Sequence, residues 1–188
     1  EAEVTSEESV VSAVRRTVDQ FGRVDFLVHC AGNNVKGAVL DLSVEDWSRV
    51  LDTHLTGAFL FSKWVGRHLV DRGEGGRVVF MSSIAATAPV PERGAYSPAK
   101  AGLIGLVGLL SLEWAEYNIN VNAVCPGMVM TPMTEMVYKR DPSLRPQRLK
   151  RMPARREAYP EEVADLVLFL CSDKANHING TAIPIDGA

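Results

Sequence analysis

Residues 77–127 read RVVFMSSIAATAPVPERGAYSPAKAGLIGLVGLLSLEWAEYNINVNAVCPG and hold two short apolar runs on either side of a long, largely apolar segment. The two runs, 77–82 and 119–125, are rich in Val, which is typical of strands buried on both faces. The segment between them, from about Ala95 to Tyr117, is long enough for a helix of the buried core. A strand, a helix and a second strand in this order predict a parallel pair joined by a crossover helix.

The same alternation continues on both sides of this stretch. Pro160 followed by Glu161 and Glu162 is typical of a first helical turn, because acidic side chains favour the positive end of the helix dipole. Gly22 and Gly73 are placed to end helices. The other predicted elements are a helix that opens at Thr5 with Glu8 as a capping box, a strand at 24–29, a helix that opens at Ser43 with Asp46, a partly helical stretch at 126–158, and a strand at 181–185.

The order of these elements predicts a single α/β domain over residues 1–188, with a doubly wound parallel sheet between two layers of helices. In such sheets a ligand binds beyond the carboxyl ends of the strands. The segments that follow the first three predicted strands are 30–34, 82–86 and 126–131, so functional side chains are expected there.

Charge and composition exclude several classes of function. The 188 residues carry a formal net charge of −3, which gives no support for a nucleic-acid surface. Cys30, Cys125 and Cys171 are far apart and match no metal spacing, and scattered thiols favour a reducing, cytoplasmic location over a disulfide framework. The most apolar run, 101–112, is too short to span a membrane, and the first residues lack the basic and apolar regions of a signal peptide.

Tyr96 and Lys100 are four residues apart near the start of the predicted core helix, so they share one face. A phenol titrates at about 10, and a fixed ammonium beside it lowers that pKa by favouring the phenolate. Such a pair can pass a proton to or from an alcohol or a carbonyl. Ser83, at the end of the preceding strand, can donate a hydrogen bond to a substrate oxygen. The alternatives are a solvated Tyr and Lys on an ordinary helix and a serine that only caps a loop.

Seven motifs follow one another along the chain: VDFLVHCAGNN, HLTGAFLFSK, VVFMSSIAA, AYSPAKAGLIGL, INVNAVCPGMVMTPM, YPEEVADLVLFLCSD and INGTAIPIDGA. In this order they resemble the short-chain dehydrogenase/reductase family, of the kind related to 3-oxoacyl-(acyl-carrier-protein) reductases and sugar or polyol dehydrogenases. The resemblance covers nearly the whole chain and implies a Rossmann-like fold of three αβα layers. It also implies an NAD(P)-dependent enzyme that interconverts a secondary alcohol and a ketone by hydride transfer.

The resemblance implies roles for the residues at matching positions. Tyr96 would be the general acid/base, Lys100 would hold the nicotinamide ribose and Ser83 would orient the substrate oxygen. His54 stands where the family carries an Asn that supports a proton relay. The residues expected to contact NAD or NADP are Glu3, Val4, Cys30, Ala31, Gly32, Tyr96, Lys100, Pro126, Gly127, Val129 and Thr131. No metal is expected.

Three departures from the family pattern bear on function. Cys30 stands where the family has an Asn before Ala-Gly, and His54 either replaces the helix Asn through a hydrogen bond or is an ordinary helix residue. The Gly-rich turn that binds the pyrophosphate has no counterpart, because Gly102, Gly105 and Gly108 lie in mid-helix and are spaced for close helix packing. The first βα units of the family are therefore expected to be missing here, which leaves the choice between NAD and NADP unreadable and predicts weak cofactor binding by this chain alone.

The expected partners are a small alcohol or ketone and further copies of the same chain. The helices from Ser43 and from Ala95 are apolar on more than one side, which favours a homo-oligomer, a dimer or a tetramer. Residues 139–156 contain one acidic residue, Asp141, and eight basic residues. The basic residues are Lys139, Arg140, Arg145, Arg148, Lys150, Arg151, Arg155 and Arg156. This stretch predicts either a cationic lid for an anionic substrate or a solvated basic face. The alternative to an enzyme is an inactive homologue that keeps the fold for assembly.

Overall fold

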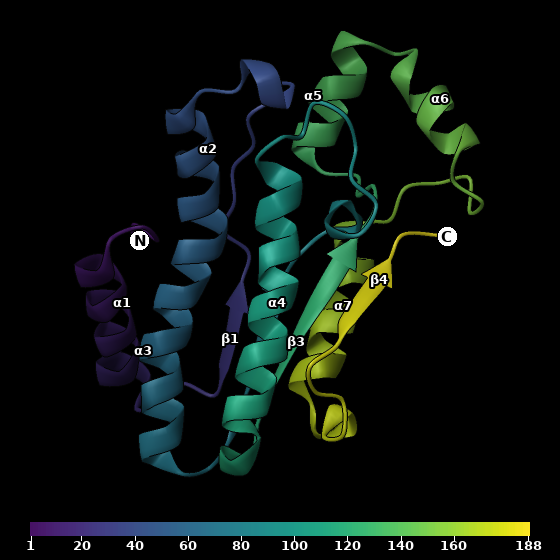
Figure 1. The fold of residues 1–188 in the computed structure, drawn as a ribbon. Helices are drawn as coiled ribbons and strands as arrows, with labels where there is room; N and C mark the ends of the chain where they lie inside the picture. The colour runs from purple at the N-terminus through teal and green to yellow at the C-terminus, as the bar shows by residue number, and fades with distance from the viewer.

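The computed structural model describes every residue from Glu1 to Ala188 and contains a four-stranded parallel sheet with helices on both faces (Figure 1). The strands lie side by side in chain order: β1 (Phe26–His29), β2 (Gly76–Met81), β3 (Ile119–Pro126) and β4 (Ala182–Ile185). The helices are α1 (Glu7–Phe21), α2 (Val44–Leu51), α3 (Gly57–Arg72), α4 (Tyr96–Trp114), α5 (Pro132–Arg140), α6 (Leu144–Lys150) and α7 (Pro160–Cys171). The predicted Rossmann-like α/β fold is confirmed, and none of its helices is both long and apolar enough to pass through a membrane.

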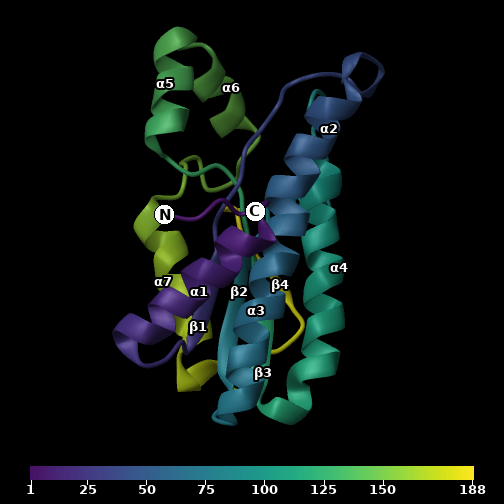
Figure 2. The ribbon, with the colours of Figure 1, turned by 90° about the vertical axis from the view of Figure 1, so that its left-hand side faces the viewer.

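Two apolar layers hold the helices to the sheet. On one face, Phe80 of β2 packs in a buried cluster with Leu103 and Val107 of α4. On the other face, Val79 of β2 packs in a buried cluster with Leu170 of α7. Figure 2 shows the resulting layers, with α3 and α4 on one side of the sheet and α7 on the other, while α1 packs against α3. Burial on both faces explains why β2 and β3 are continuous apolar runs.

The first helix begins one residue later than predicted. Ser6, not Thr5, is its N-cap, and the Ser6 side chain accepts a hydrogen bond from the Ser9 amide. The predicted capping box with Thr5 is therefore wrong, since the Thr5 hydroxyl donates to the carboxylate of Glu3 instead. Gly22 ends α1 with a φ of 81°, a left-handed conformation that favours glycine.

The second predicted helix has an interruption that the sequence analysis did not foresee. Ser43 opens α2 by accepting a hydrogen bond from the Asp46 amide, and Gly73 ends α3 with a φ of 73°, both as predicted. Between α2 and α3, residues Asp52–Thr56 form a π-helical turn. The Gly57 amide there donates to the carbonyl of Asp52, five residues earlier, where an α-helix would use the residue four earlier.

β1 is buried on one face only, unlike β2 and β3. Leu27 and His29 point into the layer of α3 and α4 and are buried. Phe26 and Val28 point to the other face, where they are 53% and 40% exposed. The exposure arises because α7 packs against β2 and β3 and not against β1, and because β1 pairs with β2 alone.

The three glycines of α4 differ in their surroundings. A Cβ atom on Gly102 would lie 2.8 Å from a methyl carbon of Leu55, so the predicted close helix packing is confirmed at that position. A Cβ atom on Gly105 or Gly108 would meet no atom within 4 Å. The prediction of close packing within one chain is therefore wrong for Gly105 and Gly108. These two glycines leave an open strip along the helix.

Candidate active site

Lys100 joins the start of α4 to the end of β2. Its Nζ donates to the carbonyl of Met81 at 2.5 Å, and the Ser82 hydroxyl donates to the Lys100 carbonyl at 2.9 Å. The side chain is buried, and burial lowers the pKa of Lys100 to about 8. Pro98 stands in the first turn of α4, where its missing N–H removes no helical hydrogen bond. The helix therefore starts in the geometry that the Tyr-x-x-x-Lys spacing requires.

Tyr96 lies close to two cations and an imidazole, and the guanidinium carbon of Arg93 is 5.8 Å from the centroid of the Tyr96 ring. The Lys100 Nζ is 5.5 Å from the centroid of its ring. The ring of His54 meets it nearly at a right angle, at 88°, with the two centroids 5.5 Å apart. The Tyr96 hydroxyl makes no hydrogen bond within the chain, and the side chain is only partly buried. The phenol is thus free to reach an oxygen of a bound molecule.

His54 reaches Tyr96 from the π-helical turn. Its Nε2 lies 2.7 Å from the Asn33 carbonyl oxygen and 3.1 Å from the Asn33 amide nitrogen, and the shorter contact fits Nε2–H as donor. The other nitrogen, Nδ1, is buried without a partner. Burial, followed by the nearby Lys100, lowers the pKa of His54, so the ring is neutral at physiological pH. A Cβ atom on Gly32 would lie 2.4 Å from the His54 ring, so only glycine fits there.

Ser83 follows β2 at the same edge of the sheet. Its Oγ accepts a hydrogen bond from the Ala85 amide at 3.1 Å and caps a short 3₁₀ turn, which leaves the hydroxyl hydrogen free to be donated. The thiol of Cys125 lies close to Ser82 and Ser83, and burial raises its pKa. Burial also raises the pKa of the Cys30 thiol. Both cysteines are therefore neutral thiols and not activated nucleophiles.

The Pro126–Thr131 segment forms a turn beyond the end of β3. The Gly127 amide donates to the Ile185 carbonyl at 3.0 Å, and a Cβ atom on Gly127 would lie 2.8 Å from Cβ of Asp186. Val129 forms an isolated parallel bridge with Ala158. The Thr131 hydroxyl caps α5 by accepting from the Thr134 amide. These contacts fix the turn at the edge that also holds Ser83.

Two predicted residues lie apart from this cluster. Val4 packs against the first residue of α3, since a Cβ atom on Gly57 would lie 3.1 Å from its Cγ2. The Glu3 carboxylate accepts hydrogen bonds from Thr5. No hydrogen bond or aromatic contact joins Glu3 or Val4 to Tyr96.

His29 is a site residue that sequence reasoning missed. It is the last residue of β1, and its Nε2 is buried without a partner. Burial first, then Lys100 and His54, lowers its pKa to about 4. The only signal in the sequence was an imidazole at the carboxyl end of an apolar strand, next to Cys30.

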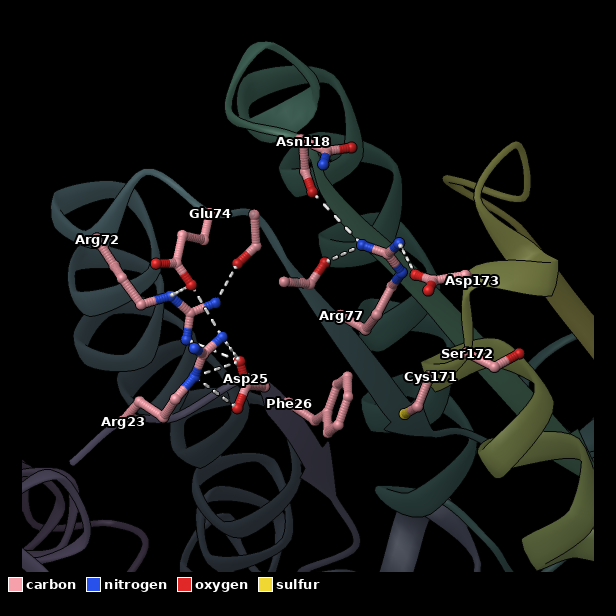
Figure 3. A pocket seen from close by; sticks show the side chains of 12 residues that line it. Arg23, Asp25, Phe26, Arg72, Glu74, Arg77, Asn118, Cys171, Ser172 and Asp173 are labelled. Carbon is pink, nitrogen blue, oxygen red and sulfur yellow. Dashed lines mark hydrogen bonds and ion pairs between the residues drawn. The ribbon is translucent and has the colours of Figure 1, made fainter. Parts of the chain in front are cut away.

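A pocket of about 440 Å³ lies elsewhere, at the amino end of the sheet (Figure 3). Arg72 pairs there with Asp25 at 2.9 Å, and Arg23 pairs with Glu74 at 3.0 Å. The charges that line the pocket therefore largely compensate one another. None of the predicted site residues lines this pocket. Ligands of parallel α/β sheets bind at the opposite edge, so we place the candidate site around Tyr96. No group of three or more His, Cys, Asp or Glu side chains is arranged to hold a metal ion.

Known proteins share this sequence and this fold. The family described as Enoyl-(Acyl carrier protein) reductase matches residues 1–187. The 3-oxoacyl-[acyl-carrier-protein] reductase FabG of Thermotoga maritima is 36% identical over 184 residues, which cover 98% of this chain and 73% of that protein. A putative short-chain alcohol dehydrogenase from Sinorhizobium meliloti superposes with a TM-score of 0.93 at 33% identity, covering 99% of this chain and 73% of the other. NAD⁺-bound xylitol dehydrogenase gives a TM-score of 0.93 at 32% identity, covering 100% and 77%.

These matches extend over almost the entire chain, and the segments that align include the strand ends and the helix that carry Ser83, Tyr96 and Lys100. The chain therefore belongs to the short-chain dehydrogenase/reductase family, as the order of its motifs predicted.

Proposed function

We propose that this protein interconverts a secondary alcohol and a ketone by NAD(P)-dependent hydride transfer, with Tyr96 as the general acid/base. The observation that carries the proposal is the unbonded Tyr96 phenol, placed between the Lys100 amine and the His54 ring at the carboxyl edge of the sheet. The similarity to NAD⁺-bound xylitol dehydrogenase supports a nicotinamide cofactor and leaves NAD and NADP as alternatives.

The residues present fit the nicotinamide and ribose half of such a cofactor. An ammonium has three N–H donors, and Lys100 has one partner in the chain, the Met81 carbonyl. Its other donors would hold the ribose hydroxyls, and the turn of Pro126, Gly127, Val129 and Thr131 would contact the carboxamide end. The bound nicotinamide would supply or accept the hydride. Residues 1–188 offer no Gly-rich turn for the pyrophosphate half.

The side chains would divide the proton chemistry among them. In ketone reduction, Tyr96 would donate its hydroxyl proton to the substrate oxygen; in alcohol oxidation it would take that proton back. Ser83 would donate its free hydroxyl hydrogen to the same oxygen and fix its position. The Lys100 ammonium would stabilise the phenolate that Tyr96 leaves behind. His54 would restrain the ring of Tyr96 through its edge-on contact.

Lys100 destabilises the fold at neutral pH, which supports a functional role for its burial. A pKa lowered from 10.5 to about 8 costs about 3 kcal/mol of stability while the lysine is protonated in both states. The cost is fully present below pH 8 and disappears as the pH rises from 8 through 10.5. A residue kept at such a cost is typical of an active site.

The stretch of eight bases runs from the last turn of α5 through α6 and the loop after it, above the carboxyl edge of the strands (Figure 1). Two of its arginines serve the fold, because Arg145 pairs with Glu157 at 3.1 Å and Arg156 pairs with Glu162 at 2.6 Å. The bases without a carboxylate partner are Lys139, Arg140, Arg148, Lys150, Arg151 and Arg155. We propose that this cationic surface attracts an anionic substrate.

A homo-oligomer is the assembly that we propose. Phe59 on α3 and Leu109 on α4 are exposed, and Leu112 on α4 is 81% exposed. The open strip at Gly105 and Gly108 lies on the same helix as these leucines. An apolar surface of this kind on two neighbouring helices is typical of an interface between subunits.

Replacing Tyr96 with Phe in the natural full-length protein should abolish turnover while leaving the fold intact, because the ring still packs and only the transferable proton is lost. The rate should fall by about 10²–10⁴, the usual effect of removing a general acid/base. Initial rates of turnover with NADH and with NADPH measure this fall. The matched control is Tyr117→Phe, because Tyr117 is an exposed tyrosine. Near-normal turnover by Tyr96→Phe would remove Tyr96 from the mechanism. A wild-type protein that binds cofactor but turns over no substrate would favour the inactive homologue.

Replacing Lys100 with Met should raise the free energy of unfolding at pH 7 by about 2 kcal/mol, because burial of the charge is relieved and only the hydrogen bond to Met81 is lost. The difference in the free energy of unfolding between Lys100→Met and the wild-type protein should shrink as the pH approaches 10. Urea unfolding at pH 7 and pH 10 measures both values, with Lys174→Met, at an exposed lysine, as the control. If Lys100→Met lowered the free energy of unfolding equally at pH 7 and pH 10, the claim that Lys100 is a buried cation would be contradicted.

Raising the salt concentration should lower kcat/KM for an acidic substrate and leave a neutral analogue nearly unchanged, because salt screens exposed charges. Arg151→Glu should lower kcat/KM for the acidic substrate by about tenfold. Arg15→Glu, on exposed α1, is the matched charge reversal. If Arg151→Glu lowered kcat/KM equally for the acidic and the neutral substrate, these bases would serve only folding or solubility.

Light scattering of the full-length protein should give a mass of at least two subunits. Leu112→Glu should weaken the assembly, because it places a charge on the proposed interface. Leu40→Glu introduces the same charge at a residue that is 97% exposed outside these helices, and it should leave the mass unchanged. A monomeric wild-type protein would refute the proposal.

A further inference from the structure

Arg93 is a cation at the candidate site that no carboxylate neutralises. Its guanidinium carbon is 5.8 Å from the centroid of the Tyr96 ring, and the side chain is partly buried. Unlike Arg145 and Arg156, it forms no ion pair and no side-chain hydrogen bond within the chain. A guanidinium stays charged at physiological pH and has five N–H donors, so all of these donors are available to a bound molecule.

The backbone of Arg93 is held from two directions. Gly37, in the loop after β1, forms a parallel bridge with Arg93, and the Gly37 amide donates to the Glu92 carbonyl at 3.2 Å. The Ser97 amide, in the first turn of α4, donates to the Arg93 carbonyl at 3.2 Å. The side chain of Arg93 therefore starts from a fixed point beside the helix that carries Tyr96.

Arg93 also lines a cavity of about 250 Å³ between the loop after β1 and the loop that leads into α4. The Ser97 hydroxyl belongs to the same lining, and it is buried without a hydrogen-bond partner. A buried hydroxyl without a partner is uncommon in a folded protein. Glu92 is the one acidic residue in the lining, and it is exposed and forms no ion pair with Arg93. The remaining walls are mainly apolar, with Val39, Val90 and three prolines.

These groups select a ligand by its chemistry. A guanidinium binds a carboxylate through two parallel N–H···O bonds, and the free Ser97 hydroxyl offers a further donor. Because the guanidinium lies close to the Tyr96 ring, a carboxylate bound to it would be only a few bonds from an oxygen that Tyr96 protonates. The acid group and the reacting carbonyl would therefore belong to one short molecule.

We propose that Arg93 determines substrate specificity by binding the carboxylate of a short oxo acid, or of the corresponding hydroxy acid, whose reacting oxygen lies at Tyr96. The kinetic part rests on the proposed function, whereas binding of the acid does not. Arg93 would act by direct contact in the bound complex. The bases of residues 139–156 would act at a distance, through attraction that salt screens.

Arg93→Gln in the full-length enzyme tests the contact, because it removes the charge and keeps much of the side-chain length. The probes are pyruvate, acetoacetate and levulinate, each compared with its methyl ester at high salt. For the best acid, kcat/KM should fall by about a hundredfold, mainly through KM, while kcat/KM for its ester stays within about twofold. Arg93→Lys should recover part of the loss, since it restores the charge without the planar fork of donors.

The matched control is Arg67→Gln, because the Arg67 guanidinium also lies over an aromatic ring, at 4.6 Å from the centroid of Trp64 on α3. It should leave the ratio of kcat/KM for acid and ester unchanged. An equal fall for acid and ester in Arg93→Gln would mean that Arg93 only supports the ring of Tyr96, and would overturn the proposal. A wild-type preference for the esters would overturn it as well.

Binding can be measured without turnover, on the full-length protein saturated with oxidised cofactor. The NMR signal of the Arg93 Nε–H group, assigned by its loss in Arg93→Lys, should shift on addition of a keto acid and not of its methyl ester. If none of the three acids shifts this signal, the proposal is overturned. If an acid shifts it but no substrate is turned over, the proposed function fails and the acid-binding site stands.

Discussion

The hydrogen bond from the Lys100 ammonium to the Met81 carbonyl is the interaction on which the site depends. It ties the first turn of α4 to the carboxyl end of β2, and the Ser82 hydroxyl reinforces the tie by donating to the Lys100 carbonyl. The crossover from β2 through α4 to β3 brings these two element ends to one edge. Because Lys100 is held there without a carboxylate, its charge remains available to Tyr96 and to a bound molecule. The site is therefore built at the expense of stability, as active sites commonly are.

Neutral imidazoles form the other side of the site. Burial, followed by the nearby Lys100, lowers the pKa values of His29 and His54, so both rings are neutral and the cations close to the ring of Tyr96 are Lys100 and Arg93. His54 owes its position to a π-helical turn, and such turns are frequent at functional sites.

Much of the fold could be predicted from the sequence because its signals are local. Gly22 and Gly73 end helices through a left-handed conformation, and Ser43 caps α2 through its own side chain. Adjacent Thr5 and Ser6 are both good caps, so the pattern could not fix which one opens α1. The exposure of Phe26 depends on which helix covers β1, and that is decided by elements distant in sequence.

The candidate site was predictable to a smaller extent. The spacing of Tyr96 and Lys100 survives in the structure because both lie on one short helical face. The π-helical turn at His54 is defined by the hydrogen bond from the Gly57 amide to the Asp52 carbonyl, and no residue pattern considered in the sequence signals that bond. His29 could not be identified because only the folded chain shows that it is buried close to Lys100 and His54. Only the structure shows that Nε2 of His29 is buried without a hydrogen-bond partner.

The pKa of Lys100 in the folded protein tests the central claim most directly. NMR titration of the lysine side chain, with carbon-13 next to the amine, follows Lys100 separately from the exposed lysines. The structure predicts a midpoint of about 8 for Lys100, because burial disfavours its charged form. A midpoint at the ordinary lysine value of about 10.4 would show that the ammonium is solvated and would contradict the site as described.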